Sequence, residues 1–165
     1  DEPVDLVTLA QACADRFRAV GPAVTAETGA GPALISAPPE WIDRLAGVLM
    51  DNACRYAGAD GQVRIGVRAQ GSRVSLTVED SGPGIPAEER PRLFDRFHRA
   101  TEHGPGAGLG LAIGDSIVRS TGGRWQVGDS PLGGALLAVS WRHTQPHRPS
   151  ARGSAGAASP ARVSS

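Results

Sequence analysis

Residues 38–57, PPEWIDRLAGVLMDNACRYA, are the stretch that most constrains the fold. Two prolines open the stretch, and apolar side chains then recur at helical spacing: Trp41, Ile42, Leu45, Val48, Leu49 and Ala53. This pattern predicts an amphipathic helix whose apolar face packs on a core. Asn52, Arg55 and Tyr56 follow at spacings of three and four residues, which place them within reach of one ligand.

The flanking segments predict strands and further helices. Residues 61–70 and 71–80 alternate between apolar and polar side chains around Gly71-Ser72, which is typical of a β-hairpin. Hydrophobic spacing predicts an extended piece at 3–7 and strands at 23–28, 32–37, 124–130 and 135–141. It also predicts three further helices, one from Asp5 or Thr8 to about Val20, one at 86–94 and one at 109–122. Segregated helices and mostly antiparallel strands predict an α+β fold. We expect a two-layer α/β sandwich, in which about three helices cover one mixed sheet.

Composition predicts one folded domain and a tail. The chain has 165 residues, of which 40% are hydrophobic, and residues 1–141 are enough for a single core. Residues 142–165 consist mainly of Ser, Ala, Gly, Pro and Arg, and are predicted to be disordered. No apolar run reaches the length of a membrane span, and the first ten residues lack the features of a signal peptide.

Charge and cysteine usage narrow the class further. The 17 basic residues are all arginine, and four of them follow Trp141, where there is no acidic residue. The folded part therefore carries about four more acidic than basic groups, which argues against a DNA-binding surface. Cys13 and Cys54 have no metal-binding spacing and are expected to be buried in a reducing compartment, so we expect a cytoplasmic domain.

Two glycine-rich stretches suggest a nucleotide site. A P-loop is excluded because it needs a lysine, and the chain has none. The sequence GPGIPA at 82–87 has the letters of a dinucleotide fingerprint, but Pro83 and Pro86 interrupt the turn and an antiparallel hairpin precedes it. That alternative is disfavoured.

Four segments in order resemble the nucleotide-binding boxes of the ATP-binding domain of sensor histidine kinases. They are MDNACRYA at 50–57, EDSGPGIP at 79–86, RLFDRFHRA at 92–100 and GAGLGLAI at 106–113. The family belongs to the wider group of DNA gyrase B, Hsp90 and MutL. The resemblance covers roughly the whole folded part and implies a Bergerat-type ATP-binding fold.

The resemblance implies roles for the first two boxes. Asn52 would bind Mg²⁺ through its amide oxygen, Arg55 would pair with phosphate and Tyr56 would pack on adenine. Relatives often carry a second Asn one helical turn earlier, where this chain has Val48. In the second box, Asp80 would accept a hydrogen bond from the adenine amino group. Gly82 and Gly84 would let the base approach the backbone, and Ile85 would line the pocket.

The remaining boxes would form a lid over the phosphates. Arg96 and Arg99 are candidate phosphate contacts, and residues 98–105 form the predicted mobile segment. Three glycines and a leucine would form the back half of the lid and present N–H groups where the next helix begins, near position 109. These residues are Gly106, Gly108, Leu109 and Gly110.

By this resemblance the chain binds Mg-ATP and donates the γ-phosphoryl group to a histidine on a separate helical dimerisation domain, upstream of a response regulator. None of the four histidines lies on a helix of that kind, and no catalytic residue is assigned. Val48 cannot accept a proton, which favours a kinase or a binding module over an ATPase. A serine kinase of the anti-sigma-factor type and a nucleotide-gated interaction module without catalysis stay open. We expect no contact with nucleic acid or membrane.

Overall fold

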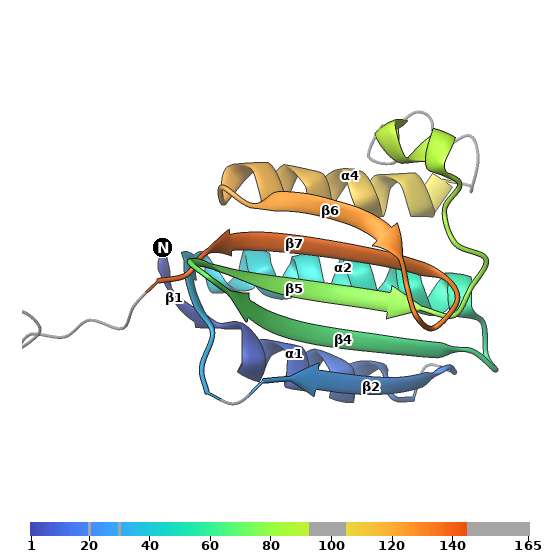
Figure 1. Cartoon of the computed structure of the whole chain (residues 1–165), viewed down its shortest axis with the longest axis horizontal. Coiled ribbons are helices and arrows are strands. Elements are labelled where there is room, and N and C mark those ends of the chain that lie inside the picture. The colour runs from blue at the N-terminus through green and yellow to red at the C-terminus, as the bar shows by residue number, and fades with distance from the viewer. Residues whose placement is uncertain (20, 30, 93–104, 145–165) are drawn as a thin grey trace, which may run out of the picture.

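A computed structural model of the chain describes residues 1–19, 21–29, 31–92 and 105–144. These residues form two layers, a five-stranded sheet and a layer of helices (Figure 1). The strand order is β2-β4-β5-β7-β6. The bounds are β2 Ala23–Thr28, β4 Gln62–Gln70, β5 Arg73–Asp80, β6 Arg124–Asp129 and β7 Ala135–Arg142. β2 pairs with β4 in parallel and all other neighbours are antiparallel, so the predicted mixed, mostly antiparallel sheet is confirmed.

The central hairpin follows directly from its alternating sequence. β4 and β5 pair from Val63–Asp80 to Gln70–Arg73, and Gly71 turns the chain with a φ of 61°. The positive φ suits glycine, which has no Cβ to clash. Alternate residues of β5 are buried against the helices, namely Val74, Leu76, Val78 and Asp80. The intervening residues therefore face the other side of the sheet.

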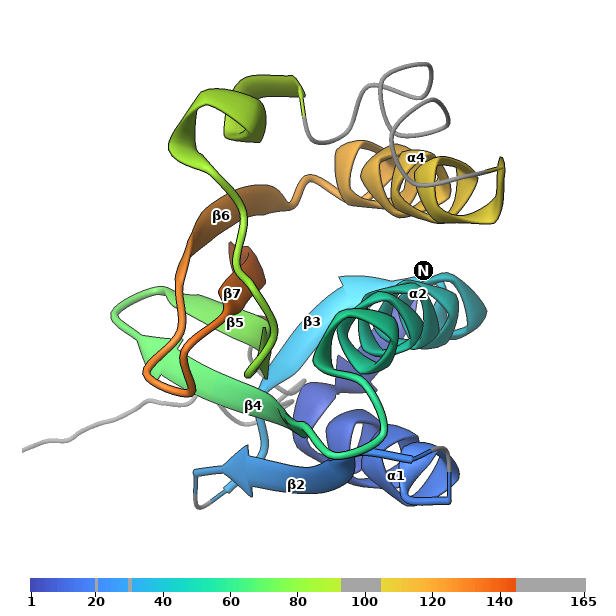
Figure 2. The ribbon, with the colours of Figure 1, turned by 90° about the vertical axis from the view of Figure 1, so that its right-hand side faces the viewer.

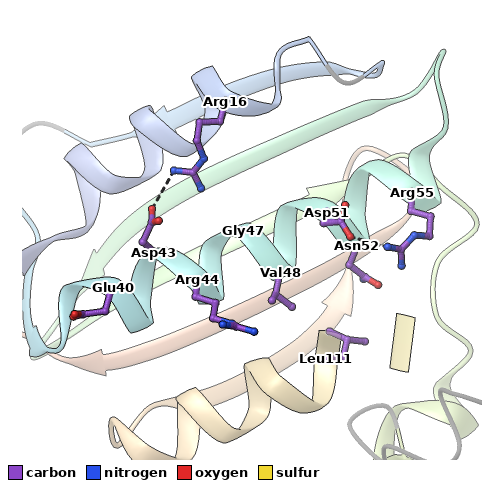
Figure 3. A pocket seen from close by; sticks show the side chains of 10 residues that line it. All are labelled: Arg16, Glu40, Asp43, Arg44, Gly47, Val48, Asp51, Asn52, Arg55 and Leu111. Carbon is purple, nitrogen blue, oxygen red and sulfur yellow. Dashed lines mark hydrogen bonds and ion pairs between the residues drawn. The ribbon is translucent and has the colours of Figure 1, made fainter. Parts of the chain in front are cut away.

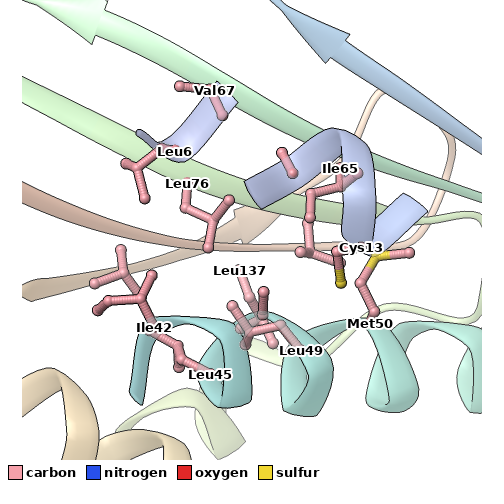
Figure 4. Close-up of a cluster of buried hydrophobic side chains, with 14 of the residues drawn as sticks. Leu6, Cys13, Ile42, Leu45, Leu49, Met50, Ile65, Val67, Leu76 and Leu137 are labelled. Atoms are coloured by element: carbon pink, nitrogen blue, oxygen red, sulfur yellow. The ribbon is translucent and has the colours of Figure 1, made fainter. Parts of the chain in front are cut away.

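Three α-helices lie on one side of the sheet (Figure 2). They are α1 Leu6–Phe17, α2 Pro39–Ala57 and α4 Pro105–Ser120. Asp5 caps α1, because its Oδ1 accepts a hydrogen bond of 3.1 Å from the Val7 N–H. Leu6, Ile42, Leu45, Leu49, Ile65 and Leu76 meet in the core between the two layers (Figure 4). The predicted α+β two-layer sandwich is therefore confirmed.

The apolar face of α2 differs from the expectation at two positions. Trp41 is 43% exposed and is the one exposed large hydrophobic side chain among the described residues. Val48 lines an open cavity rather than the sheet-facing core. Six apolar positions span a wider arc than the core covers, because α2 turns one flank toward α4 and another toward the sheet. Helical spacing alone cannot tell these flanks apart.

Two further elements depart from the prediction. The extended piece near the N-terminus forms β1, Glu2–Asp5, which pairs with β3, Leu34–Ala37, in a separate antiparallel sheet of two strands. The expected short helix is a 3-10 helix, η1, over Ala87–Arg92. Pro91 inside η1 lacks the N–H that an α-helix would need there.

β7 extends to Arg142, and two backbone hydrogen bonds continue beyond it. His143 N–H donates to Ser72 O at 2.7 Å and Thr144 N–H donates to Leu34 O at 2.8 Å. The predicted tail otherwise lies outside the described residues. Cys13 and Cys54 are buried and free, as expected, and burial raises the pKa of Cys13 to about 11. No helix among the described residues is both long and apolar enough to cross a membrane.

Candidate functional site

A cavity of about 550 Å³ opens along α2, with walls from α1, α2 and α4 (Figure 3). Asn52, the single asparagine of the chain, lines it and is only 6% exposed. Its Oδ1 is buried and accepts no hydrogen bond from the described residues. An unpaired buried oxygen destabilises a protein by about 1–3 kcal/mol, so such atoms call for a functional explanation. A hard cation or a donor on a ligand would satisfy it.

The other predicted residues on α2 divide between two places. Arg55 lines the same cavity, is exposed, and donates a hydrogen bond of 2.6 Å to Asp51 one turn earlier. Tyr56 is half-buried and is not among the residues that line the cavity. The helix therefore turns Asn52 and Arg55 toward the cavity, and Tyr56 lies outside its lining.

The cavity wall nearest to Asn52 is apolar. Val48 lies one turn before Asn52 and Leu111 of α4 lies opposite (Figure 3). Gly114 of α4 faces α2, because a Cβ there would be in ordinary van der Waals contact with Leu45 Cδ1 at 3.4 Å and Val48 Cγ1 at 3.6 Å. Among the described residues, no group of three His, Cys, Asp or Glu side chains could hold a metal by itself. A cation at Asn52 would therefore take its other ligands from water and from a bound ligand.

Asp80 ends β5 and is 4% exposed. Its Oδ1 accepts hydrogen bonds from the Gly82 N–H at 2.8 Å and the Ala135 N–H at 3.4 Å. Burial raises the pKa of this carboxyl group, and the two backbone hydrogen bonds oppose that rise. Both bonds end on Oδ1, which leaves Oδ2 as the oxygen that could accept from another donor.

The turn between β6 and β7 holds Asp80 in place. Gly134 N–H donates to Asp80 O at 3.0 Å, and a Cβ at Gly134 would lie only 2.6 Å from that oxygen and from Gly82 N. Ser130, at the start of the turn, donates through its hydroxyl to Glu79 Oε2 at 2.9 Å. Arg64 binds the other oxygen of Glu79 through Nε and Nη2 at 3.1 and 3.0 Å. The turn is thus fixed to both faces of β5.

The loop after Asp80 touches the end of α2. A Cβ at Gly82 would lie 2.6 Å from the Tyr56 carbonyl oxygen, so only glycine allows this approach. Gly84 has a φ of 82°, which also favours glycine. Ile85 is partly buried and packs against the core. The Gly82–Tyr56 contact brings Asp80 and the last turns of α2 to the same end of the molecule (Figure 1).

The lid residues are only partly described. Arg96 and Arg99 lie outside the described residues. Gly106, Gly108, Leu109 and Gly110 lie within α4, which begins at Pro105 and not near position 109 as expected. Glycine disfavours helix interiors by about 1 kcal/mol relative to alanine, which is why sequence reasoning placed these residues in a loop. Proline is favourable at the first helical position, so Pro105 can begin the helix ahead of the glycines. The apolar residues after position 110 continue the same helix.

Sequence reasoning missed the residues that orient Asp80. Glu79 stands in the second nucleotide-binding box, and Ser130, Gly134 and Ala135 stand in or between the last two predicted strands, with no chemistry that marks them as functional. The pair Gly133-Gly134 between two strands was a usable signal, because two glycines in a short connection indicate a tight turn or a close backbone approach. Nothing in the sequence, however, states which strand end that turn meets.

We predict that Gly134→Ala destabilises the fold by about 2 kcal/mol, because the new Cβ has no room against the backbone. Thermal unfolding would measure the loss, and amide hydrogen exchange at Gly82 and Ala135 would report the release of Asp80. Gly128→Ala is the matched control, since Gly128 lies in β6 with nothing within 4 Å of a Cβ. Equal losses in the two variants would contradict the close contact.

Comparison with known proteins identifies the family. Residues 37–145, more than half of the chain, match the model of the histidine kinase-, DNA gyrase B-, and HSP90-like ATPases. The chain is 43% identical over 95 residues to the two-component sensor PhoQ of Pseudomonas aeruginosa, which covers 58% of this chain and 21% of that protein. It is 33% identical over 151 residues to the signal transduction histidine-protein kinase/phosphatase MprB of Mycobacterium avium, covering 90% of this chain and 29% of MprB.

Solved structures agree with this assignment. A mycobacterial sensor histidine kinase MprB structure superposes with a TM-score of 0.72 at 26% identity, covering 86% of this chain and 97% of that one. The ATP-binding domain of PrrB from Mycobacterium tuberculosis gives a TM-score of 0.71 at 25% identity, with 87% and 98% covered. The chain spans about a fifth to under a third of the curated relatives. It is a member of the family of histidine kinase-, DNA gyrase B-, and HSP90-like ATPases.

Proposed function

We propose that this chain binds Mg-ATP at the end of the molecule where α2 meets the loop after β5. The bound chain would then position the γ-phosphoryl group for transfer to a histidine on a separate helical dimerisation domain. This transfer would serve two-component signalling through a response regulator. The observation that carries the proposal is the pair of preorganised, unfilled oxygens. One is the buried Asn52 Oδ1 and the other is Oδ2 of the clamped Asp80.

Each of these groups suits one part of Mg-ATP. The Asp80 carboxylate would accept the adenine amino proton, while Gly82 and Gly84 let the base lie close to the backbone. Asn52 would supply an oxygen ligand to Mg²⁺, which gives the phosphates a counter-charge when it is bound. Arg55 would exchange its exposed contact with Asp51 for a phosphate. Tyr56 would pack on the adenine, next to its contact with Gly82.

The remaining assignments extend from the sequence resemblance. Ile85 would line the adenine pocket, and Arg96 or Arg99 would contact phosphate. Backbone N–H groups of the first turn of α4, in the glycine-rich stretch 106–110, would face the phosphates, because the first N–H groups of a helix lack partners within it. Support for an ATP-like ligand comes from the full-length ShkA structure, solved in complex with AMPPNP. That structure has a TM-score of 0.75 at 26% identity, and covers 89% of this chain and 32% of that one.

Transfer rather than hydrolysis is favoured by the apolar wall beside Asn52. Val48 offers no proton acceptor at the position one turn before the proposed Mg²⁺ ligand, so no side chain there would activate water. The chain would contribute positioning and charge stabilisation, which dominate phosphoryl transfer. A serine kinase of the anti-sigma-factor type and a non-catalytic nucleotide-gated module share these requirements, and are distinguished by where the phosphate goes.

We expect Asp80→Asn to weaken ATP binding by about tenfold to a hundredfold, the range for loss of a hydrogen bond to a charged group. Isothermal titration calorimetry would measure the affinity, with the exposed Asp60→Asn as control.

Because burial raises the pKa of Asp80, the folded protein disfavours the ionised carboxyl near neutral pH. The variant should therefore unfold at an equal or higher temperature at pH 7, and this gain should shrink as pH falls through the raised pKa. Unchanged ATP affinity would refute the adenine contact.

Asn52→Ala tests the cation separately. ATP affinity of the unmodified chain should rise on adding Mg²⁺, and the variant should lose about tenfold of that gain while its Mg²⁺-free affinity stays the same. Because an unpaired buried oxygen is destabilising, its removal should not lower the thermal unfolding temperature. Gln126→Ala, an exposed amide on β6, serves as the control. A variant that kept the full Mg²⁺ effect would place the cation elsewhere.

The partner domain must reach the phosphate end of the nucleotide. A groove of about 360 Å³ between α2 and α4 shares Arg44 with the Asn52 cavity and is lined by Trp41, Ile113 and Ile117. An exposed tryptophan beside isoleucines suits the apolar face of a helix. This groove, adjoining the nucleotide cavity, is where the phosphoacceptor helices would dock.

Trp41→Ser should therefore slow phosphoryl transfer to an added helical phosphoacceptor domain by about tenfold or more, as for a hot-spot residue, with ATP affinity unchanged. Label from γ-labelled ATP should appear as acid-labile phosphohistidine. Acid-stable phosphoserine would favour the serine kinase alternative, and absence of any label with normal ATP binding would favour the interaction module.

A further inference from the structure

None of the three α-helices covers the outer face of the sheet (Figure 2). At one end of this face, strand register places arginines that form no ion pair with the described residues. Among the described side chains, Arg16, Arg18, Arg55, Arg64, Arg90 and Arg119 form ion pairs. The five remaining arginines among these side chains form no ion pair. Four of them share this end of the face, in what we call the arginine patch: Arg68, Arg73, Arg124 and Arg142.

Strand register brings the patch together. Arg73 on β5 pairs with Arg142 on β7, so both side chains stand on the same face. The next row on this face lies two residues further along β5, where Ser75 pairs with Arg68 of β4 and with Ser140 of β7. Ser140 in turn pairs with Arg124 of β6. Arg73 reaches across β7, donating from Nε to Ser140 Oγ at 3.0 Å and from Nη2 to Ser140 O at 2.8 Å. Its guanidinium therefore lies between Arg142 and Arg124.

The positive charges of the patch repel one another, and the rows of the sheet that contain them hold no acidic residue. Loss of solvent lowers the pKa of Arg73, and the charges of Arg124 and Arg142 lower it further. Two acidic residues of this face, Glu27 and Glu79, lie outside these rows and form ion pairs with Arg64. Glu27 is the nearer of the two, because it lines a hollow together with Arg68. The sequence extends the same charge: from Ser130 to Ser165 there is no acidic residue, while Arg148, Arg152 and Arg162 follow Arg142.

The side chains around the patch discriminate between polyanions. Its neighbours on this face are Gln70, Ser75, Thr77, Ala138 and Ser140, and the apolar one, Ala138, is buried. The patch therefore offers no apolar centre, which stable protein interfaces require. It also offers no aromatic side chain for stacking bases and no protruding element for a DNA groove. A flat, polar, arginine-rich surface is suited to a layer of anionic headgroups, where each basic residue adds a similar increment.

We propose that the arginine patch is a docking surface for an anionic phospholipid membrane, which holds the domain peripherally with its nucleotide end pointing away. The patch lies at the Arg73 end of β5 and Asp80 at the other end, roughly 23 Å apart at about 3.3 Å per residue. Both sites can be occupied together. The expectation of no membrane contact came with the absence of an apolar span, and the net charge conceals this local separation of charge.

The full chain would be mixed with sedimenting vesicles containing roughly one third phosphatidylserine in phosphatidylcholine, with pure phosphatidylcholine as the neutral comparison. Binding should occur only to the anionic vesicles and should weaken as salt is raised from roughly 0.1 M to 0.5 M. Arg124→Gln/Arg142→Gln should lower the partition about twenty-fivefold, at about fivefold per arginine. Both side chains are exposed, so thermal unfolding and ATP affinity should not change.

Arg18→Gln/Arg119→Gln is the matched control, because it removes the same charge from exposed, ion-paired arginines outside the sheet, one at the C-cap of α1 and one in α4. It should lower the partition less than about twofold. Equal losses in the two double variants would overturn the proposal, since net charge alone would then be responsible. So would a loss seen only in Arg148→Gln/Arg152→Gln/Arg162→Gln. Binding to duplex DNA or to polyglutamate without binding to anionic vesicles would also overturn it.

Discussion

The site depends on one constraint: the Asp80 carboxylate must stay buried with a single orientation. Two backbone N–H groups hold Oδ1, one from the following loop and one from β7, while Gly134 supplies the space that any other residue would fill. A buried carboxylate is unfavourable unless it is well bonded, so this geometry tolerates little change. The sheet, the β6–β7 turn and the end of α2 all meet at this side chain, and the ligand site follows from their meeting.

The second support of the site lies on the opposite face of the same strand. Side chains alternate along β5, so Glu79 points outward where Asp80 points inward. Arg64 and Ser130 bind the two oxygens of Glu79, which ties the β6–β7 turn to β5 from outside. A mutation at Ser130 would thus reach Asp80 without touching a ligand. Residues that position another group in this way cannot be recognised as functional from their own chemistry.

Much of the architecture followed from local patterns. The strands at β4 and β5, the long helix α2 and the two-layer arrangement were predictable, because alternation and helical spacing report which side chains are buried. Asp80 and Asn52 were found because their residue types and order resemble a family. Three features were not accessible: the separate β1–β3 sheet, the start of α4 at Pro105, and the exposure of Trp41. Each depends on which distant element lies next to the segment, and glycine in α4 misleads a rule built on isolated helices.

Net charge was the least informative sequence property, and the reason is geometric. A count of acids and bases assumes mixing, yet in this sheet Arg64 meets both Glu27 and Glu79, and the arginines at the far end meet no acid among the described residues. The field a partner feels falls off within about a Debye length, near 10 Å at ordinary salt, so only the local cluster acts on it. The two ends of β5 are separated by more than that length. Charge at the arginine patch can therefore orient the domain without disturbing the phosphate and adenine contacts proposed at the opposite end.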